Sequence, residues 1–195
     1  MSPCAGIGGP AGLKGSDGPA GQARARAQGI ESQVCRRVVM ALQPLQAALG
    51  EIHWVTCSGA MGESALKDLG VEDGEVVYVA PSVTKGLDTQ QATRALQAAK
   101  LDLLLFAGGD GTARDVLDAA AADQTILGIP CGVKMHSGVF ANHPLAVAEI
   151  IQDMMAGRLL SAVLGEVRDI DEVAFRTGRV LAKFYGEVQI PAGLG

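Results

Sequence analysis

The sequence predicts an α/β protein built on a mostly parallel, doubly wound (Rossmann-like) sheet. Short apolar runs typical of buried strands alternate with segments whose apolar residues recur every three or four positions, as they do in helices. The most apolar run is LDLLLFA at residues 101–107. Its hydrophobicity is continuous, as in a central parallel strand that is covered on both faces. Together these two observations define the predicted fold class.

The composition is that of a folded globular chain, and it excludes several functions. Its 195 residues suit one large domain or one and a half small ones. Because 48% of the residues are hydrophobic and 19% are charged, a disordered chain is excluded. The 16 basic and 21 acidic residues give a formal net charge of −5, which argues against a nucleic-acid binder. The apolar runs are too short for a membrane span. Four scattered cysteines without a CxxC pair, and no signal-peptide pattern, predict a cytoplasmic protein without a zinc site.

Residues 1–29 form a glycine-rich segment that differs from the rest of the chain. They include eight glycines and three prolines. This composition favours a flexible leader. The alternative is a glycine-rich loop whose backbone amides approach an anion together with Lys14 and Ser16. The spacing leaves both interpretations open.

The elements of the first half follow from periodicity and from glycine and proline. Apolar residues at helical spacing predict a helix within residues 22–49, which Pro44 kinks or divides. We then expect a strand at 52–57, a helix at 59–69 ending at Gly70, a strand at 75–79, and a helix from Asp88 or Thr89 through residue 100.

The second half repeats the alternation of strands and helices. The strand at 101–107 leads into the loop GGDGT at 108–112. A helix at 113–122, a strand at 126–129, and a helix at 144–155 that ends at Gly157 come next. Strands at 161–170 and 182–190 flank a short helix near 171–179.

The GGDGT loop is the strongest chemical signal. Ligands of open parallel sheets bind at the carboxyl ends of the strands, and the next helix points its free N–H groups toward that edge, so a phosphate site is predicted. Gly108, Gly109 and Gly111 let the backbone approach a ligand, and Thr112 can cap the helix or donate to a phosphate. Asp110 can serve as a general base, a Mg²⁺ partner or an acceptor for a sugar hydroxyl. An ordinary turn is the alternative, but three glycines in four positions exceed what a turn requires.

Four segments in the same order resemble the ATP-NAD kinase family. The likeness is greatest to the predicted ATP- or polyphosphate-dependent NAD kinases that include the acetoin-catabolism X protein (AcoX). The segments are CAGIGGPAGLKGSDG at 4–18, LLLFAGGDGTARDV at 103–116, LGIPCGVKMHSGVFA at 127–141 and GEVRDIDEVAFRTGRVLAKFYG at 165–186.

The resemblance implies the N-terminal domain of the NAD kinase fold. It also implies phosphoryl transfer from ATP or polyphosphate to the ribose 2′-hydroxyl of NAD, giving NADP, with a divalent metal such as Mg²⁺. Asp110 matches the family's catalytic aspartate. The neighbouring Gly108, Gly109, Gly111 and Thr112 match its phosphate-binding loop.

A second loop, residues 132–140, lies where NAD kinases place a glycine-containing loop against the dinucleotide. By this resemblance Lys134 meets a phosphate, and His136 or Ser137 hydrogen-bonds a ribose or pyrophosphate. A solvated lysine and a satisfied loop histidine are the alternatives. Arg114 either reaches a phosphate or forms a surface ion pair. The acidic residues after the strand at 161–170 are expected to cap a helix, so no metal-binding set is predicted; they are Asp169, Asp171 and Glu172.

Three regions are therefore expected: the glycine-rich segment 1–29, a nucleotide-binding α/β domain at 30–160, and at 161–195 the start of a crossover into a second, β-rich domain that is largely absent. The expected partners are small-molecule nucleotides and a second copy in a homo-oligomer. No nucleic-acid or membrane partner is expected. Two alternative functions remain: a kinase for another small hydroxylated metabolite, for example one of acetoin catabolism, and a non-catalytic nucleotide-binding module.

Overall fold

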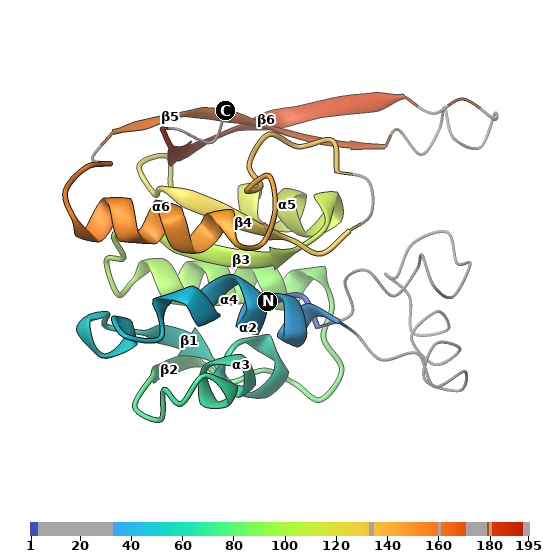
Figure 1. Cartoon of the computed structure of the whole chain (residues 1–195). Coiled ribbons are helices and arrows are strands. Elements are labelled where there is room, and N and C mark those ends of the chain that lie inside the picture. Colours follow the sequence, from blue (N-terminus) through green and yellow to red (C-terminus); the bar gives the residue numbers. More distant parts are fainter. Residues whose placement is uncertain (4–32, 133–134, 160, 171–178, 180, 193–195) are drawn as a thin grey trace.

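In the computed structural model, helices alternate with short strands (Figure 1). It describes residues 1–3, 33–132, 135–159, 161–170, 179 and 181–192. The strands are β1 (Val55–Cys57), β2 (Glu75–Tyr78), β3 (Leu104–Gly108), β4 (Ile126–Pro130), β5 (Ala162–Ile170) and β6 (Ala182–Pro191). The α-helices are α2 (Val34–Leu42), α3 (Glu63–Asp68), α4 (Gly86–Gln97), α5 (Asp110–Leu117) and α6 (Ala146–Met155). Short 3₁₀ turns are η1 (Gln43–Leu45), η2 (Leu49–Glu51) and η3 (Gly59–Met61).

The described strands form three separate pairs. β1 and β2 are parallel, β3 and β4 are parallel, and β5 and β6 form an antiparallel hairpin. Figure 1 shows the hairpin at the top, β3 and β4 in the middle, and β1 and β2 at the bottom. The predicted α/β class is thus confirmed, whereas the continuous doubly wound sheet is not. The reason is local: no described strand lies between β1 and β3 to join the two parallel pairs.

The β3–β4 pair is buried on both faces. Ala107, Leu127 and Ile129 face a core shared with α2 and α6. Leu104, Phe106 and Ile126 face a second core that is shared with α5 and the hairpin. This two-sided burial explains why the sequence of β3 is a continuous apolar run. Because β3 is packed on both faces, its carboxyl end is held in place next to the start of α5.

Several element boundaries agree with the local signals in the sequence. α2 ends just before Pro44, which lies in the first turn of η1, as expected for a residue that cannot continue a helix. Gly70 follows α3 with φ +84°, a left-handed conformation that favours glycine. Gly157 follows α6 with φ +67°. The part of the first predicted helix before residue 33, and the helix predicted near 171–179 apart from Arg179, lie outside the described residues.

The start of α4 differs from the prediction. The helix begins at Gly86 with Lys85 as N-cap, rather than at Asp88 or Thr89. The Asp88 carboxylate reaches back and accepts a hydrogen bond of 2.7 Å from the Lys85 backbone N–H. An acidic residue at the third position of a helix can therefore accept a hydrogen bond from the N-cap N–H, so an acidic residue does not by itself mark the helix boundary.

Among the helices that the structure describes, none combines the length and apolar character needed to cross a membrane.

Candidate active site at the end of strand β3

The site begins where β3 runs directly into α5. β3 extends through Gly108, Gly109 is the N-cap, and Asp110 is the first residue of the helix. GGDGT is therefore a strand–helix junction and not a separate loop, and the predicted helix at 113–122 begins three residues earlier than expected. The junction is tight because a Cβ atom on Gly108 would lie 2.5 Å from the Cβ of Thr112. At Gly109 no heavy atom of the described residues lies within 4 Å of such a Cβ, so these residues leave the helix start open on that side.

Asp110 joins this junction to a segment far along the chain. Its side chain is 7% exposed. One carboxylate oxygen accepts a hydrogen bond of 2.7 Å from the His136 backbone N–H. The other accepts a bond of 3.0 Å from the Ser137 backbone N–H. Because each carboxylate oxygen can accept two hydrogen bonds, both retain capacity for a ligand.

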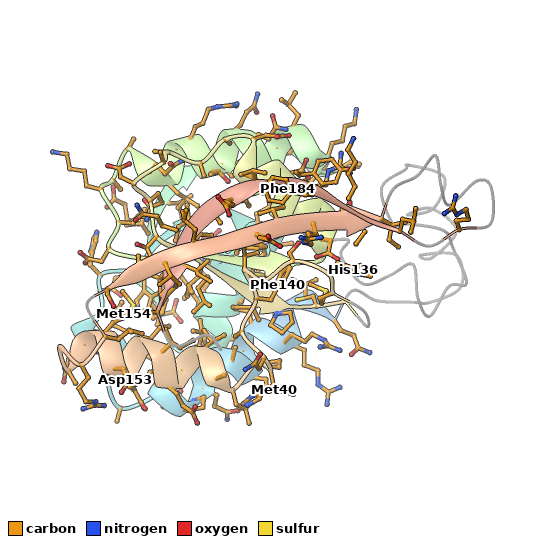
Figure 2. The ribbon with its side chains drawn as sticks, turned by 90° about the horizontal axis from the view of Figure 1, so that it is seen from above. Met40, His136, Phe140, Asp153, Met154 and Phe184 are labelled. Atoms are coloured by element: carbon orange, nitrogen blue, oxygen red, sulfur yellow. The ribbon has the colours of Figure 1, made fainter. Side chains whose placement is uncertain are left out.

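Ser137 in turn fixes the hairpin against the site. Its hydroxyl donates to the Arg168 carbonyl at 2.7 Å and accepts from the Arg168 backbone N–H at 2.9 Å. The adjacent Gly138 N–H donates to the carbonyl of Glu166 at 2.8 Å. Figure 2 shows His136 beside the hairpin, where the two strands cross over the molecule. Three chain segments, namely the β3–α5 junction, residues 135–138 and β5, thus meet at Asp110.

His136 also contributes an unsatisfied polar atom. Its imidazole Nε2 is buried and has no hydrogen-bond partner among the described residues. Burial without a partner costs free energy. The atom is therefore a candidate donor or acceptor that a rearranged or ligand-bound site would satisfy.

A charged cluster borders the site on α5. The Arg114 guanidinium forms an ion pair of 3.1 Å with Asp169 on β5 and lies 4.2 Å from the ring centroid of Tyr185 on β6. Lys183 lies 5.3 Å from the same centroid. Burial lowers the pKa of Arg114, but the hydrogen bond to Asp169 and nearby acidic groups outweigh burial and raise it overall. Arg114 therefore remains charged and holds the hairpin to α5.

The structure brings most of the predicted site residues together. Asp110, His136 and Ser137 are joined by hydrogen bonds, and the junction residues Gly108, Gly109, Gly111 and Thr112 precede or begin the same helix. Lys134 and residues 4–29 of the glycine-rich segment lie outside the described residues. Nucleotide binding by these residues stays a prediction.

Two features of the site were not predicted. They are the contact of the Tyr185 ring with Arg114 and the hydrogen bonds between Ser137 and the backbone of Arg168. Neither leaves a local signal, because the partners are far apart in sequence: Ser137 and Arg168 are separated by 31 positions. The sequence gives no sign that Arg114 and Asp169 form a pair, and only the fold brings them together. The other acidic residues of that cluster, Asp171 and Glu172, lie outside the described residues.

Comparison with protein families shows to which family the chain is similar. The family model of the ATP-NAD kinase N-terminal domain matches residues 23–159, which include the β3–α5 junction and the segment that bonds to Asp110. Comparison with curated proteins and with solved structures gives no match.

Proposed function

We propose that this chain, which belongs to the ATP-NAD kinase family through its N-terminal domain, transfers a phosphoryl group from ATP or polyphosphate to the ribose 2′-hydroxyl of NAD, giving NADP. Family membership supports a kinase function in general. The observation that supports this particular chemistry is Asp110, a nearly buried carboxylate fixed by two backbone amides at the start of a helix. Within the family, we place the chain in the AcoX branch on its four similar segments.

Asp110 would act on the acceptor hydroxyl. Its two amide contacts hold the carboxylate in one orientation, so the free acceptor positions on its oxygens also have fixed directions. A ribose hydroxyl that donates to one of them is aligned for attack, and the carboxylate can take the proton as the new bond to phosphorus forms. Phosphoryl transfer depends mainly on such positioning and on charge stabilisation.

The start of α5 would hold a phosphate. Because the N-cap residue Gly109 has no side chain, no cap side chain occupies the first N–H groups of the helix. The helix dipole favours an anion at this end. The missing side chain of Gly109 leaves open space in front of these donors. Gly111 and Thr112 would contribute the next amides, and His136 Nε2 would reach the ribose or pyrophosphate.

The family uses a divalent metal together with ATP and NAD, and the residues present fit a metal that arrives with the nucleotide. Among the described residues, no group of three or more His, Cys, Asp or Glu side chains could hold a metal ion. Mg²⁺ is commonly held by one or two carboxylates plus substrate phosphates, and Asp110 could provide such a carboxylate. When bound, Mg²⁺ would neutralise phosphate charge.

The remaining parts of the proposal concern the setting of the enzyme. We place it in the cytoplasm as a homo-oligomer that binds small-molecule nucleotides and neither nucleic acid nor membranes. The crossover at 161–195 into a second, β-rich domain also belongs to this proposal, with the β5–β6 hairpin as its described part.

The proposed function is tested by assaying NADP formation from NAD with ATP–Mg²⁺ and with polyphosphate. We expect turnover in the wild type and a loss of about 100-fold or more in Asp110→Asn, because the amide cannot accept a proton. Asp123→Asn is the matched control, since Asp123 is exposed. Nucleotide binding is measured in parallel by calorimetry. Wild-type protein that binds nucleotide but forms no NADP with either donor would instead indicate a non-catalytic module.

A further inference from the structure

Arg37 brings a guanidinium group to the carboxyl end of β4. It is the fourth residue of α2, and its Nη1 donates a hydrogen bond of 3.2 Å to the carbonyl of Pro130, the last residue of β4. In the strand register Pro130 is the partner of Gly108, which is followed by Gly109, the N-cap of α5. Arg37 therefore lies at the same end of the β3–β4 pair as Asp110.

The guanidinium and the β3–α5 junction lie on opposite sides of β4. Cys131 N–H donates to the Gly108 carbonyl, so odd-numbered residues of β4 direct their backbone groups toward β3. Successive residues of a strand direct these groups to opposite edges, so the Pro130 carbonyl points away from β3. Gly128 agrees, because its N–H donates to the Val139 carbonyl. With one strand spacing and a hydrogen bond between them, the guanidinium and the end of β3 are roughly 8–10 Å apart.

The packing of α2 holds Arg37 in this position. Val34 and Val38, on either side of it in the helix, are buried in the core that includes Leu127 and Ile129 of β4. The Arg37 side chain itself is only partly exposed. A side chain that is held on a packed helix has less conformational entropy to lose when it binds a ligand.

The charge of Arg37 has no acidic partner among the described residues. The other arginines that the structure describes are either ion-paired, namely Arg114, Arg158 and Arg168, or exposed, namely Arg36, Arg94 and Arg179. A partly buried cation costs free energy unless an anion balances it. A guanidinium has five N–H donors, and Pro130 takes one, so four are left for such an anion.

The Cys131 thiol does not balance this charge. The Arg37 guanidinium is close enough to act against the rise of the thiol pKa. Burial nevertheless dominates and raises the pKa of Cys131 to about 11, so the thiol is neutral at pH 7. An unbalanced positive charge therefore remains at the end of β4.

We propose that Arg37 binds one end of a polyphosphate chain whose other end lies at the start of α5. The inference rests on the proposed function, which places a phosphate at that helix start. A single phosphate cannot contact both groups across roughly 8–10 Å, whereas the linked phosphates of a nucleotide can. The planar guanidinium suits phosphate oxygens, which accept two parallel N–H bonds. The triphosphate of ATP and the pyrophosphate of NAD share this chemistry.

The inference is tested by calorimetric titration of the full chain with tripolyphosphate, the inorganic form of such a chain. We expect Arg37→Gln to raise the Kd about 10-fold or more, because charge-assisted hydrogen bonds are lost. Arg37→Lys keeps the charge without the planar donor pair, so its Kd should be intermediate. Arg36→Gln is the matched control: it removes the same charge from an exposed neighbour on the same helix, and its Kd should stay within about twofold of the wild type.

Equal Kd values for Arg36→Gln and Arg37→Gln would overturn the inference, and so would a wild type that does not bind tripolyphosphate. A purely structural role would lower the Tm of Arg37→Gln and leave its Kd unchanged. We expect the reverse, with a Tm within about 5 °C of the wild type, since only one hydrogen bond within the protein is lost.

Titration with ATP and with NAD then identifies the source of the chain, because only the nucleotide that contacts Arg37 should bind more weakly to Arg37→Gln. Unchanged Kd values for both nucleotides would overturn the inference. Asp110→Asn separates it from the proposed function: this variant should lose NADP formation but bind tripolyphosphate at least as tightly as the wild type, since a negative charge is removed. A wild type that forms no NADP, together with weaker tripolyphosphate binding in Arg37→Gln, would refute the proposed function and support the role of Arg37.

Discussion

Asp110 illustrates how single residues set the chemistry of this molecule. A nearly buried carboxylate is costly unless it is hydrogen-bonded. Here the backbone amides of His136 and Ser137 supply these bonds and at the same time fix the direction of both oxygens. The same contacts that stabilise the carboxylate therefore also fix its orientation.

Cys131 shows the opposite behaviour, because its environment favours the neutral form. The residue follows β4, is 6% exposed, and donates weakly from its sulfur to the Ile129 carbonyl. Burial raises the pKa of its thiol from 9.0 to about 11. The thiolate is therefore disfavoured in the folded state relative to the unfolded chain.

This shift predicts a loss of stability in alkaline solution. Because the folded pKa is raised, the stabilisation is complete below about pH 9 and is lost as pH rises toward about 11. Two pKa units correspond to about 2–3 kcal/mol. Urea unfolding of wild type and Cys131→Ala at about pH 8 and about pH 11 should show a larger decline in the wild type. An equal decline in the free energy of unfolding of the two proteins would show that Cys131 does not cause the alkaline loss of stability.

The junction of β3 and α5 is the element that determines the site. The strand ends where its two-sided burial ends, and the helix begins with a single residue between them. Gly108 permits the close approach of Thr112, whereas Gly109 leaves space open in front of the helix. The two neighbouring glycines therefore differ: Gly108 is required for close packing, whereas Gly109 would admit a phosphate under the proposed function.

Replacing each glycine by alanine should separate these roles. We expect Gly108→Ala to destabilise the protein by about 1–3 kcal/mol, since the new Cβ would lie 2.5 Å from that of Thr112. Gly109→Ala should change the free energy of unfolding by less than about 1 kcal/mol, because its φ of −112° suits any residue. It should nevertheless weaken ATP binding in calorimetry. A Gly108→Ala protein as stable as the wild type would show that the junction relaxes easily.

At the scale of the whole molecule, the hairpin completes the site from outside the α/β layers. The Arg114–Asp169 ion pair and the Ser137–Arg168 hydrogen bonds attach β5 to α5 and to residues 135–138. Ligand binding at Asp110 should therefore be transmitted to the hairpin and to the stability of the entire chain.

A thermal-shift titration measures this coupling. A ligand that binds only the folded state adds about 2.7 kcal/mol at 100 times its Kd. For a chain of this size we expect Tm to rise by about 5–10 °C with NAD, NADP or ATP–Mg²⁺. Inorganic phosphate at the same concentration is the control for a general anion effect. An unchanged Tm with all three nucleotides would contradict a preformed nucleotide site in this chain.

The amino-acid sequence by itself determined the α/β class, most element positions and the location of Asp110 after a buried strand. These features depend on local signals: a continuous apolar run, helical periodicity, and glycine or proline at element ends. The GGDGT motif lies within five consecutive residues, so a candidate site could be predicted there without knowing the fold. Its resemblance to the ATP-NAD kinase family is confirmed by the family match over residues 23–159.

Only the tertiary structure decided which groups meet at that motif and how the strands associate. The partners of Asp110 lie 26 and 27 positions away, and Arg114 and Asp169 are 55 positions apart. The two parallel pairs remain separate, although the alternating pattern predicted one sheet. Periodicity records whether each face of an element is buried. It does not indicate which edge of a strand pairs with another strand. The backbone N–H and C=O groups that form this pairing are nearly the same in every residue, so they leave no pattern in the sequence.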